Sequence, residues 1–171
     1  MLTRRLHIFN ATIPHLRSLV ASRTHFIDSF DITPEPGFEG LPESLGYALW
    51  MLDRGAVDPV WWMYFFVHRE RKRLIGSGGF QGGPDDSGIV EIGYTISPSY
   101  RGRGYGTEAA RALVNMAFGF SKVKGIRAKT VSAPNASIRV LEKCGFCFDQ
   151  ELMDEYNGVI WHWIKRRPSG Y

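Results

Sequence analysis

A glycine-rich loop between an expected strand and an expected helix constrains this chain more than any other feature. The apolar stretch at 89–96 is typical of a strand, and Arg-Gly-Arg-Gly-Tyr-Gly-Thr follows at 101–107. Apolar residues then recur at helical spacing from about Gly104 to Phe118. This order presents free backbone N–H groups at the positive end of a helix dipole. The sequence therefore predicts a site for a phosphate or a pyrophosphate.

The spacing of the glycines excludes two common phosphate loops. An ATP-type loop needs a lysine directly after its last glycine, whereas Thr107 follows here. A dinucleotide fold needs Gly-x-Gly-x-x-Gly, whereas Gly102, Gly104 and Gly106 alternate. The loop has the pattern Arg-x-x-Gly-x-Gly instead.

That pattern resembles the acyl-CoA pyrophosphate loop of the GNAT superfamily of N-acetyltransferases. A second stretch, Pro-Asn-Ala-Ser-Ile-Arg-Val-Leu-Glu-Lys-Cys-Gly-Phe at 134–146, resembles another hallmark helix of that superfamily. It is most similar to the branch that contains the ribosomal-protein alanine N-acetyltransferases. The close resemblance covers roughly residues 74–147, whereas residues 23–60 resemble no family motif.

The resemblance implies an α/β (α+β) fold: a single GNAT domain over residues 1–171. It implies a mixed central sheet of about six or seven strands, flanked by about four helices. Hydrophobic periodicity and turn residues place the elements. We expect strands at Leu2–Phe9, Val60–Val67, Leu74–Phe80, Ile89–Ile96, Arg127–Val131, Phe146–Glu151 and Val159–Lys165. We expect helices at Pro14–Ala21, Ser44–Leu52, Gly104–Phe118 and Asn135–Cys144, and a loop at 28–43.

The resemblance also implies how acetyl-CoA is held, with no metal ion. The backbone near Ile96 would pair with the pantetheine arm like an added strand. Asn135 would bond the same arm. The pyrophosphate would lie on the loop residues Arg101, Gly102, Arg103, Gly104, Tyr105, Gly106 and Thr107.

Glu91 is the expected general base, because relatives carry a glutamate at this place. It lies inside an apolar strand, and burial raises the pKa of a carboxylate. The alternative is a structural glutamate bonded to backbone or to an arginine.

Ser137 is expected near the thioester sulfur of acetyl-CoA, but Asn135 precedes it by one residue fewer than in the family pattern. For both, the alternative is helix N-capping. Leu141 stands where many members of the superfamily carry a tyrosine that donates a proton to the leaving thiolate.

The implied activity is transfer of acetyl from acetyl-CoA to a primary amine, by direct attack in a ternary complex. The acceptor would be a protein N-terminus or a small-molecule amine, bound by residues 23–64 and the final hairpin. The alternative is a non-catalytic acyl-CoA-binding regulatory module. Replacing Glu91 by Gln separates them, because an enzyme loses turnover and keeps cofactor binding.

Composition excludes several other classes. The chain is 44% hydrophobic and 22% charged, with a net charge of +4 and scattered basic residues, so neither a nucleic-acid partner nor a membrane is expected. No apolar run approaches the roughly 20 residues of a membrane span. No signal peptide is apparent, so we expect a cytoplasmic protein, monomeric or homodimeric. Cys144 and Cys147 follow a helix rather than begin one, which favours buried small hydrophobes over a redox or metal site. None of the five histidines has metal-ligand spacing.

Overall fold

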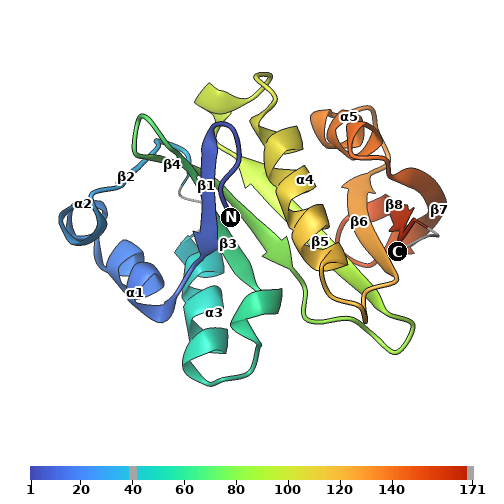
Figure 1. The fold of residues 1–171 in the computed structure, drawn as a ribbon, viewed down its shortest axis with the longest axis horizontal. Helices are drawn as coiled ribbons and strands as arrows, with labels where there is room; N and C mark the ends of the chain where they lie inside the picture. Colours follow the sequence, from blue (N-terminus) through green and yellow to red (C-terminus); the bar gives the residue numbers. More distant parts are fainter. Residues whose placement is uncertain (39–41, 169–171) are drawn as a thin grey trace.

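A mixed β-sheet runs through the centre of the computed structural model, which describes residues 1–38 and 42–168 (Figure 1). The strands lie in the order β1-β3-β4-β5-β6-β8-β7, and β2 pairs with β4. All pairs are antiparallel except β2 with β4 and β5 with β6. The bounds are β1 Leu6–Asn10, β2 Thr33–Pro34, β3 Met63–His68, β4 Arg73–Phe80, β5 Ile89–Ile96, β6 Gly125–Val131, β7 Cys147–Asp154 and β8 Gly158–Arg166.

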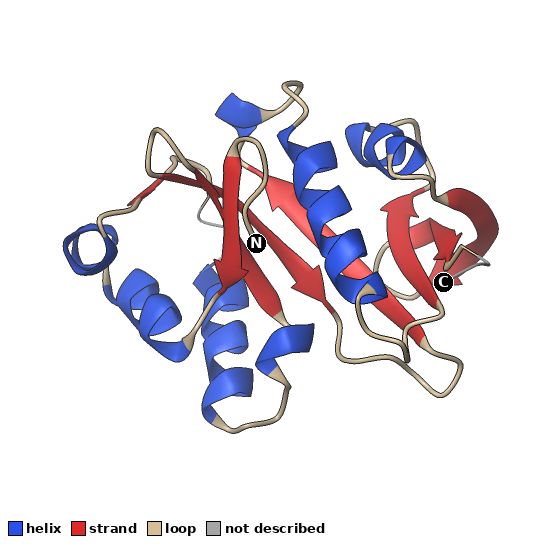
Figure 2. Ribbon diagram, viewed as in Figure 1, coloured by secondary structure: helices blue, strands red, loops and turns tan. Residues whose placement is uncertain are grey.

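Helices cover both faces of the sheet and enclose two separate cores (Figure 2). The helices are α1 Ile13–Ala21, α2 Arg23–Phe30, α3 Pro42–Asp53, α4 Tyr105–Phe118 and α5 Ala136–Lys143. On β3, Phe66 faces the core under α4 and α5, whereas its neighbour Phe65 faces the core under α1 to α3. Both phenylalanines are fully buried. Since strand side chains alternate between faces, the continuous apolar run in β3 follows from burial on both sides.

The expected mixed sheet is confirmed, with two corrections to its elements. A 3₁₀ helix at Pro59–Trp61 replaces the start of the strand expected from Val60, because the Asp58 carboxylate caps it by accepting the Val60 N–H at 2.9 Å. The loop expected at 28–43 is interrupted by the end of α2, by β2 and by the start of α3. Helix α2 forms because Ser22 Oγ caps it by accepting the His25 N–H at 3.0 Å. Residues 39–41 of that loop lie outside the described residues. The described residues thus form five α-helices, one more than the roughly four expected.

The parallel pair at the centre of the sheet is short. Strands β5 and β6 pair only from Ile89 with Gly125 to Ile92 with Ala128. Beyond that point β5 still pairs with β4, and β6 still pairs with β8. Residues 93–96 of β5 and 129–131 of β6 therefore diverge and leave an opening between two otherwise paired strands. We call this opening the split.

The two cysteines differ in their burial. Cys144 is buried in the core under α4 and α5, but Cys147 is exposed, so the expectation that both are buried is wrong for Cys147. Cys147 is the first residue of β7, whose side chains are exposed along almost its whole length because it forms an edge of the sheet.

Among the described helices, none combines the length and the apolar character needed to span a bilayer.

Several buried polar side chains lack the hydrogen-bond partners that burial normally demands, and the histidine among them is His162. His162 on β8 is only 7% exposed, and neither ring nitrogen has a hydrogen-bond partner among the described residues. Its pKa lies below the ordinary value of 6.5 for histidine, first because burial disfavours the charged ring and then because Lys129 and Arg127 repel that charge. Glu91 and Asp149 oppose the shift. The imidazole is therefore neutral near pH 7.

This histidine should make the folded state sensitive to acid. Between pH 6.5 and the lower native pKa, the unfolded chain binds a proton that the native chain does not. The free energy of unfolding therefore falls as the pH falls through this window, with a slope of at most about 1.4 kcal/mol per pH unit. We expect His162→Leu to flatten this slope between pH 7 and pH 5, measured by urea unfolding. The exposed His25, changed to Leu, is the matched control; an unchanged slope in His162→Leu would contradict the assignment.

Candidate functional site

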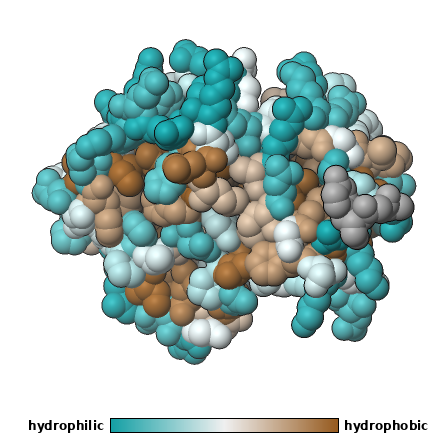
Figure 3. All heavy atoms as spheres, in the orientation of Figure 1, coloured by the Kyte–Doolittle hydropathy of each residue, from teal (hydrophilic) through white to brown (hydrophobic). Residues whose placement is uncertain are grey.

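The split opens into a cavity of about 690 Å³ that reaches from the sheet to the glycine loop. It is lined by the diverging ends of β5 and β6, the loop before α4 and the start of α5. In the space-filling view, a notch separates two hydrophilic margins near the place where the start of α4 faces α5 (Figures 1 and 3). The cavity residues include Tyr94, Thr95, Ile96, Arg101, Gly102, Gly104, Tyr105, Gly106, Thr107, Lys129, Thr130, Val131, Asn135 and Ser137.

The loop has a backbone that glycine makes possible. Gly102 and Gly104 have φ of +72° and +81°, the left-handed region that other residues rarely adopt. Gly104 is the N-cap of α4, so the free N–H groups of the first helical turn follow it directly. Gly106 differs because a Cβ there would lie 3.5 Å from Val140 Cγ2, in ordinary contact. Glycine at 106 thus keeps space open between α4 and α5.

The two arginines of the loop lie in different places. Arg101 Nε donates to the Ile96 carbonyl at 2.8 Å and ties the loop to the end of β5. Arg101 lines the cavity, but Arg103 does not. The Arg103 carbonyl accepts a hydrogen bond from Arg5 Nη1 at 2.9 Å, so its backbone joins the loop to the N-terminal segment. Since Arg101 already uses one lone pair of the Ile96 carbonyl oxygen, this oxygen can accept fewer hydrogen bonds from a ligand than the sequence suggested.

Tyr105 lies at the base of the loop, with its ring mostly buried. Its hydroxyl lies 3.1 Å from His68 Nε2, and the Arg5 guanidinium stacks 4.0 Å from the ring centroid. These contacts fix the start of α4 against β3 and against the segment that precedes β1. Thr107, one helical position beyond Gly106, lines the cavity.

Asn135 and Ser137 meet at the start of α5. Asn135 Oδ1 accepts the Ile138 N–H at 3.1 Å, and its Nδ2 donates to the Ala133 carbonyl at 2.8 Å. The N-cap alternative is therefore confirmed for Asn135, whose amide is largely occupied. Ser137 is half-buried in the cavity wall, where its side chain is hydrogen-bonded with Tyr94.

Glu91 lies on β5 beside the cavity rather than in its lining. Its side chain is 14% exposed, and Oε1 lies 3.1 Å from Lys129 Nζ. The sequence suggested backbone or arginine as the structural partner of a buried glutamate, but the partner is a lysine. Lys129 lines the cavity, so its ammonium group connects Glu91 to the split.

Tyr94 is a cavity residue to which the sequence analysis gave no role. Its hydroxyl lies 3.4 Å from the Ser137 carbonyl, which places a phenol between β5 and α5. Burial is the main cause that raises its pKa well above the usual range, so the phenol keeps its proton. The available signal was strand alternation, because Tyr94 falls on the same face as Ile92 and Ile96, toward α4.

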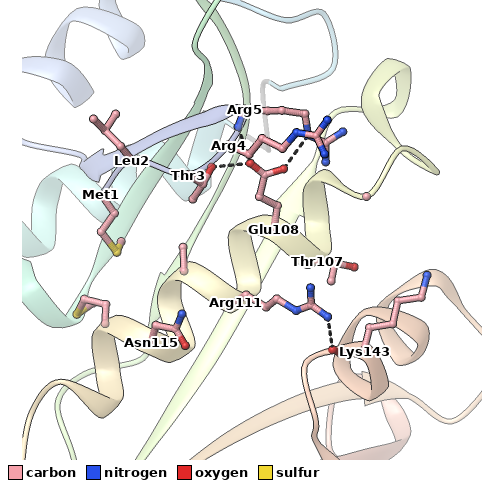
Figure 4. Close-up of a pocket in the computed structure, with 13 residues that line it drawn as sticks. Met1, Leu2, Thr3, Arg4, Arg5, Thr107, Glu108, Arg111, Asn115 and Lys143 are labelled. Carbon is pink, nitrogen blue, oxygen red and sulfur yellow. Dashed lines mark hydrogen bonds and ion pairs between the residues drawn. The ribbon is translucent and has the colours of Figure 1, made fainter.

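A second cavity, of about 780 Å³, lies between the N-terminal segment and the outer surface of α4 (Figure 4). Gly104 and Thr107 line both cavities. Glu108 accepts hydrogen bonds from Thr3 Oγ1 at 2.6 Å and from Arg5 Nε at 2.7 Å. Burial opposes ionisation of Glu108, but these hydrogen bonds outweigh it and hold its pKa below the ordinary value. Arg5 thus neutralises Glu108, and the other basic residues of the lining, Arg4, Arg111 and Lys143, give this surface a positive charge.

The aromatic residues of the expected acceptor region divide into core and surface. Phe26 and Phe38 are buried in the core under α1 to α3. Tyr47 and Trp50 on α3 are 55% and 49% exposed, and their rings stack at a centroid distance of 6.1 Å. Within residues 1–38 and 42–168, no three His, Cys, Asp or Glu side chains gather as a metal site would need.

A domain model and a related protein match this sequence. The sequence model of the Acetyltransferase (GNAT) domain matches residues 33–147. The chain is 35% identical over 101 residues to the uncharacterized N-acetyltransferase YjdG of Bacillus subtilis, which is 59% of this chain and 57% of that protein. The match thus spans little more than half of that relative's length.

Solved structures share the fold at low sequence identity. The ribosomal-protein-S5-alanine acetyltransferase from Vibrio fischeri superposes with a TM-score of 0.70 at 13% identity, covering 99% of this chain and 97% of that one. The aminoglycoside acetyltransferase AAC(6′)-Ib, solved in complex with coenzyme A, gives 0.66 at 19% identity, with 95% of each chain covered. Since the matching domain model spans well over half of its residues, the chain belongs to the GNAT family of acetyltransferases.

Proposed function

We propose that this protein transfers acetyl from acetyl-CoA to a primary amine. The observation that carries the proposal is the continuity of one cavity from the glycine loop into the split. An extended thioester cofactor needs both features at once: an anion site for its pyrophosphate and a narrow passage for its arm. A GNAT neighbour solved with coenzyme A supports the choice of cofactor.

The pyrophosphate would lie on the N–H groups that follow Gly104, where the dipole of α4 favours negative charge. The pantetheine arm would then enter the split and pair with the backbone at 93–96, which β6 leaves open. Asn135 would lie beside the pantetheine arm at the start of α5. Its amide oxygen would not be free for the arm, since it already caps the helix. The nucleotide end suits the second cavity, because Arg111 offers positive charge beside Thr107.

The acceptor amine would reach the reacting carbon from the side of Glu91. A protonated amine is not a nucleophile, so a group must accept its proton, and the Glu91 carboxylate already holds an ammonium group at 3.1 Å. The incoming amine would replace Lys129, whose side chain is 41% exposed and therefore has room to move. Direct attack then expels the CoA thiolate, toward which Tyr94 or Ser137 can donate a hydrogen bond.

Two features indicate the class of acceptor. The neighbours named above act on a ribosomal protein alanine and on aminoglycosides, both of which present amines. Exposed Tyr47 and Trp50 offer a stacked aromatic surface to such an acceptor. Aromatic faces attract cations, and Arg54 already lies 4.7 Å over the Trp50 ring. We therefore favour a cationic primary amine.

Binding of acetyl-CoA tests the cofactor site. Gly106→Glu would place a carboxylate where the pyrophosphate is proposed to lie, so we expect affinity in calorimetric titration to fall at least about tenfold, or 1.4 kcal/mol. Gly46→Glu makes the same change on α3, where a Cβ meets nothing within 4 Å, and should leave binding intact. Equal binding by both variants would contradict the proposed site.

Turnover tests the reaction. Glu91→Gln keeps the shape of the side chain and removes its basicity, so we expect acetyl transfer to a polyamine or peptide amine to slow at least about 100-fold. Calorimetric titration of the variant should give unchanged acetyl-CoA affinity. If the wild-type protein binds acetyl-CoA but transfers acetyl to no amine, the chain is a cofactor-binding regulatory module instead.

A further inference from the structure

We propose that Lys129 is itself an acetyl acceptor, so that the protein modifies the ε-amine of its own Lys129 at the mouth of the split. This inference rests on the proposed function, since acetyl-CoA supplies the acetyl group. It concerns a modification site within the cavity and not the external substrate.

The placement of Lys129 follows from the sheet register. Glu91 on β5 pairs with Arg127 on β6, and Lys129 lies two residues further along the same face. Pairing between β5 and β6 has ended by this point, so the lysine side chain stands at the edge of the split. It turns back to Glu91, with Nζ 3.1 Å from Oε1.

Lys129 combines three properties that an acceptor of this reaction needs. It is a primary amine, it lines the cavity proposed for the thioester, and it touches the proposed base. Lys143 also lines this cavity, but it has no ion pair with a carboxylate among the described residues. Since the two lysines share the cavity and differ in the carboxylate, Lys143 is an internal comparison.

Lys129 lies beside a second positive charge and a buried imidazole. His162 is its cross-strand partner on β8, and Arg127 lies on the same face of β6. The ring of His162 is buried, and neither nitrogen has a hydrogen-bond partner among the described residues. Acetylation would remove a positive charge beside Arg127 and add an amide that can hydrogen-bond.

The chemistry balances with acetyl-CoA as the only co-reactant. The Lys129 ammonium gives one proton to the Glu91 carboxylate, and the free amine attacks the thioester carbon. A C–N bond forms and the C–S bond breaks, with the electron pair leaving on sulfur. The nitrogen gives up a second proton, which the thiolate or water accepts. The products are ε-acetyl-lysine and CoA, and Glu91 returns its proton to solvent.

The test follows acetylation of each lysine over time, by peptide mass spectrometry of the full chain with saturating acetyl-CoA. We expect Lys129 to react at least about tenfold faster than Lys143, because its amine is held beside the base. The rate constant should not depend on protein concentration, as for an intramolecular reaction. Lys129→Arg should abolish this modification while calorimetric titration still shows acetyl-CoA binding.

Glu91→Gln separates catalysis from simple chemical reactivity. A carboxylate favours the charged form of a neighbouring ammonium, so its removal would speed an uncatalysed reaction at Lys129. We expect the rate at Lys129 to fall instead, because Glu91 takes the proton. A rise in this variant, or equal rates at Lys129 and Lys143 in a protein that binds acetyl-CoA, would overturn the inference and leave the proposed function standing. Absence of acetyl-CoA binding would overturn both.

Discussion

The site depends on the early end of one parallel strand pair. Between β5 and β6 the ladder stops after Ile92 and Ala128, although each strand continues in the sheet through its other neighbour. Backbone N–H and C=O groups need partners in a folded protein, so an unpaired edge inside a sheet persists only where something else can occupy it. The opening thus provides backbone hydrogen-bonding groups at the centre of the molecule, where two cores hold the flanking strands rigid.

The loop at the other end of the cavity is held from two directions. Arg101 links it to the end of β5, and the Arg103 carbonyl links it to Arg5. Arg5 also reaches Glu108 on the first turn of α4 and stacks on Tyr105. These contacts keep the left-handed backbone in one shape before any ligand arrives. A preformed anion site costs less ordering free energy on binding than a mobile loop would.

Local sequence patterns predicted the central part of the fold well. The bounds of β5 agree with the apolar run at 89–96, and α4 begins directly after its predicted start at Gly104. These elements carry their own signals: alternation, glycine with positive φ and a helical apolar stripe. Helix α2 was missed because its signal is a single serine cap before a polar segment with few apolar residues.

The candidate site was predicted only as far as local patterns reach. The glycine loop is one continuous stretch of sequence, and the start of α5 is another. The residues of each could therefore be named from the sequence. The Glu91 and Lys129 pair depends on which strands are neighbours and in what register, and β5 and β6 are separated by α4. No spacing along the chain encodes that contact. Tyr94 was passed over for a related reason, since its partner Ser137 lies on α5.

The differing reasons for glycine in the loop imply an uneven tolerance to evolutionary change. Gly102 and Gly104 are fixed by backbone conformation, so any side chain there introduces strain, whatever its chemistry. Gly106 is fixed only by the space that it leaves beside Val140. Arg103 contributes its carbonyl, which every residue possesses. We therefore expect position 103 to accept any residue, position 106 to accept residues according to their volume, and the two left-handed positions, 102 and 104, to accept almost nothing but glycine.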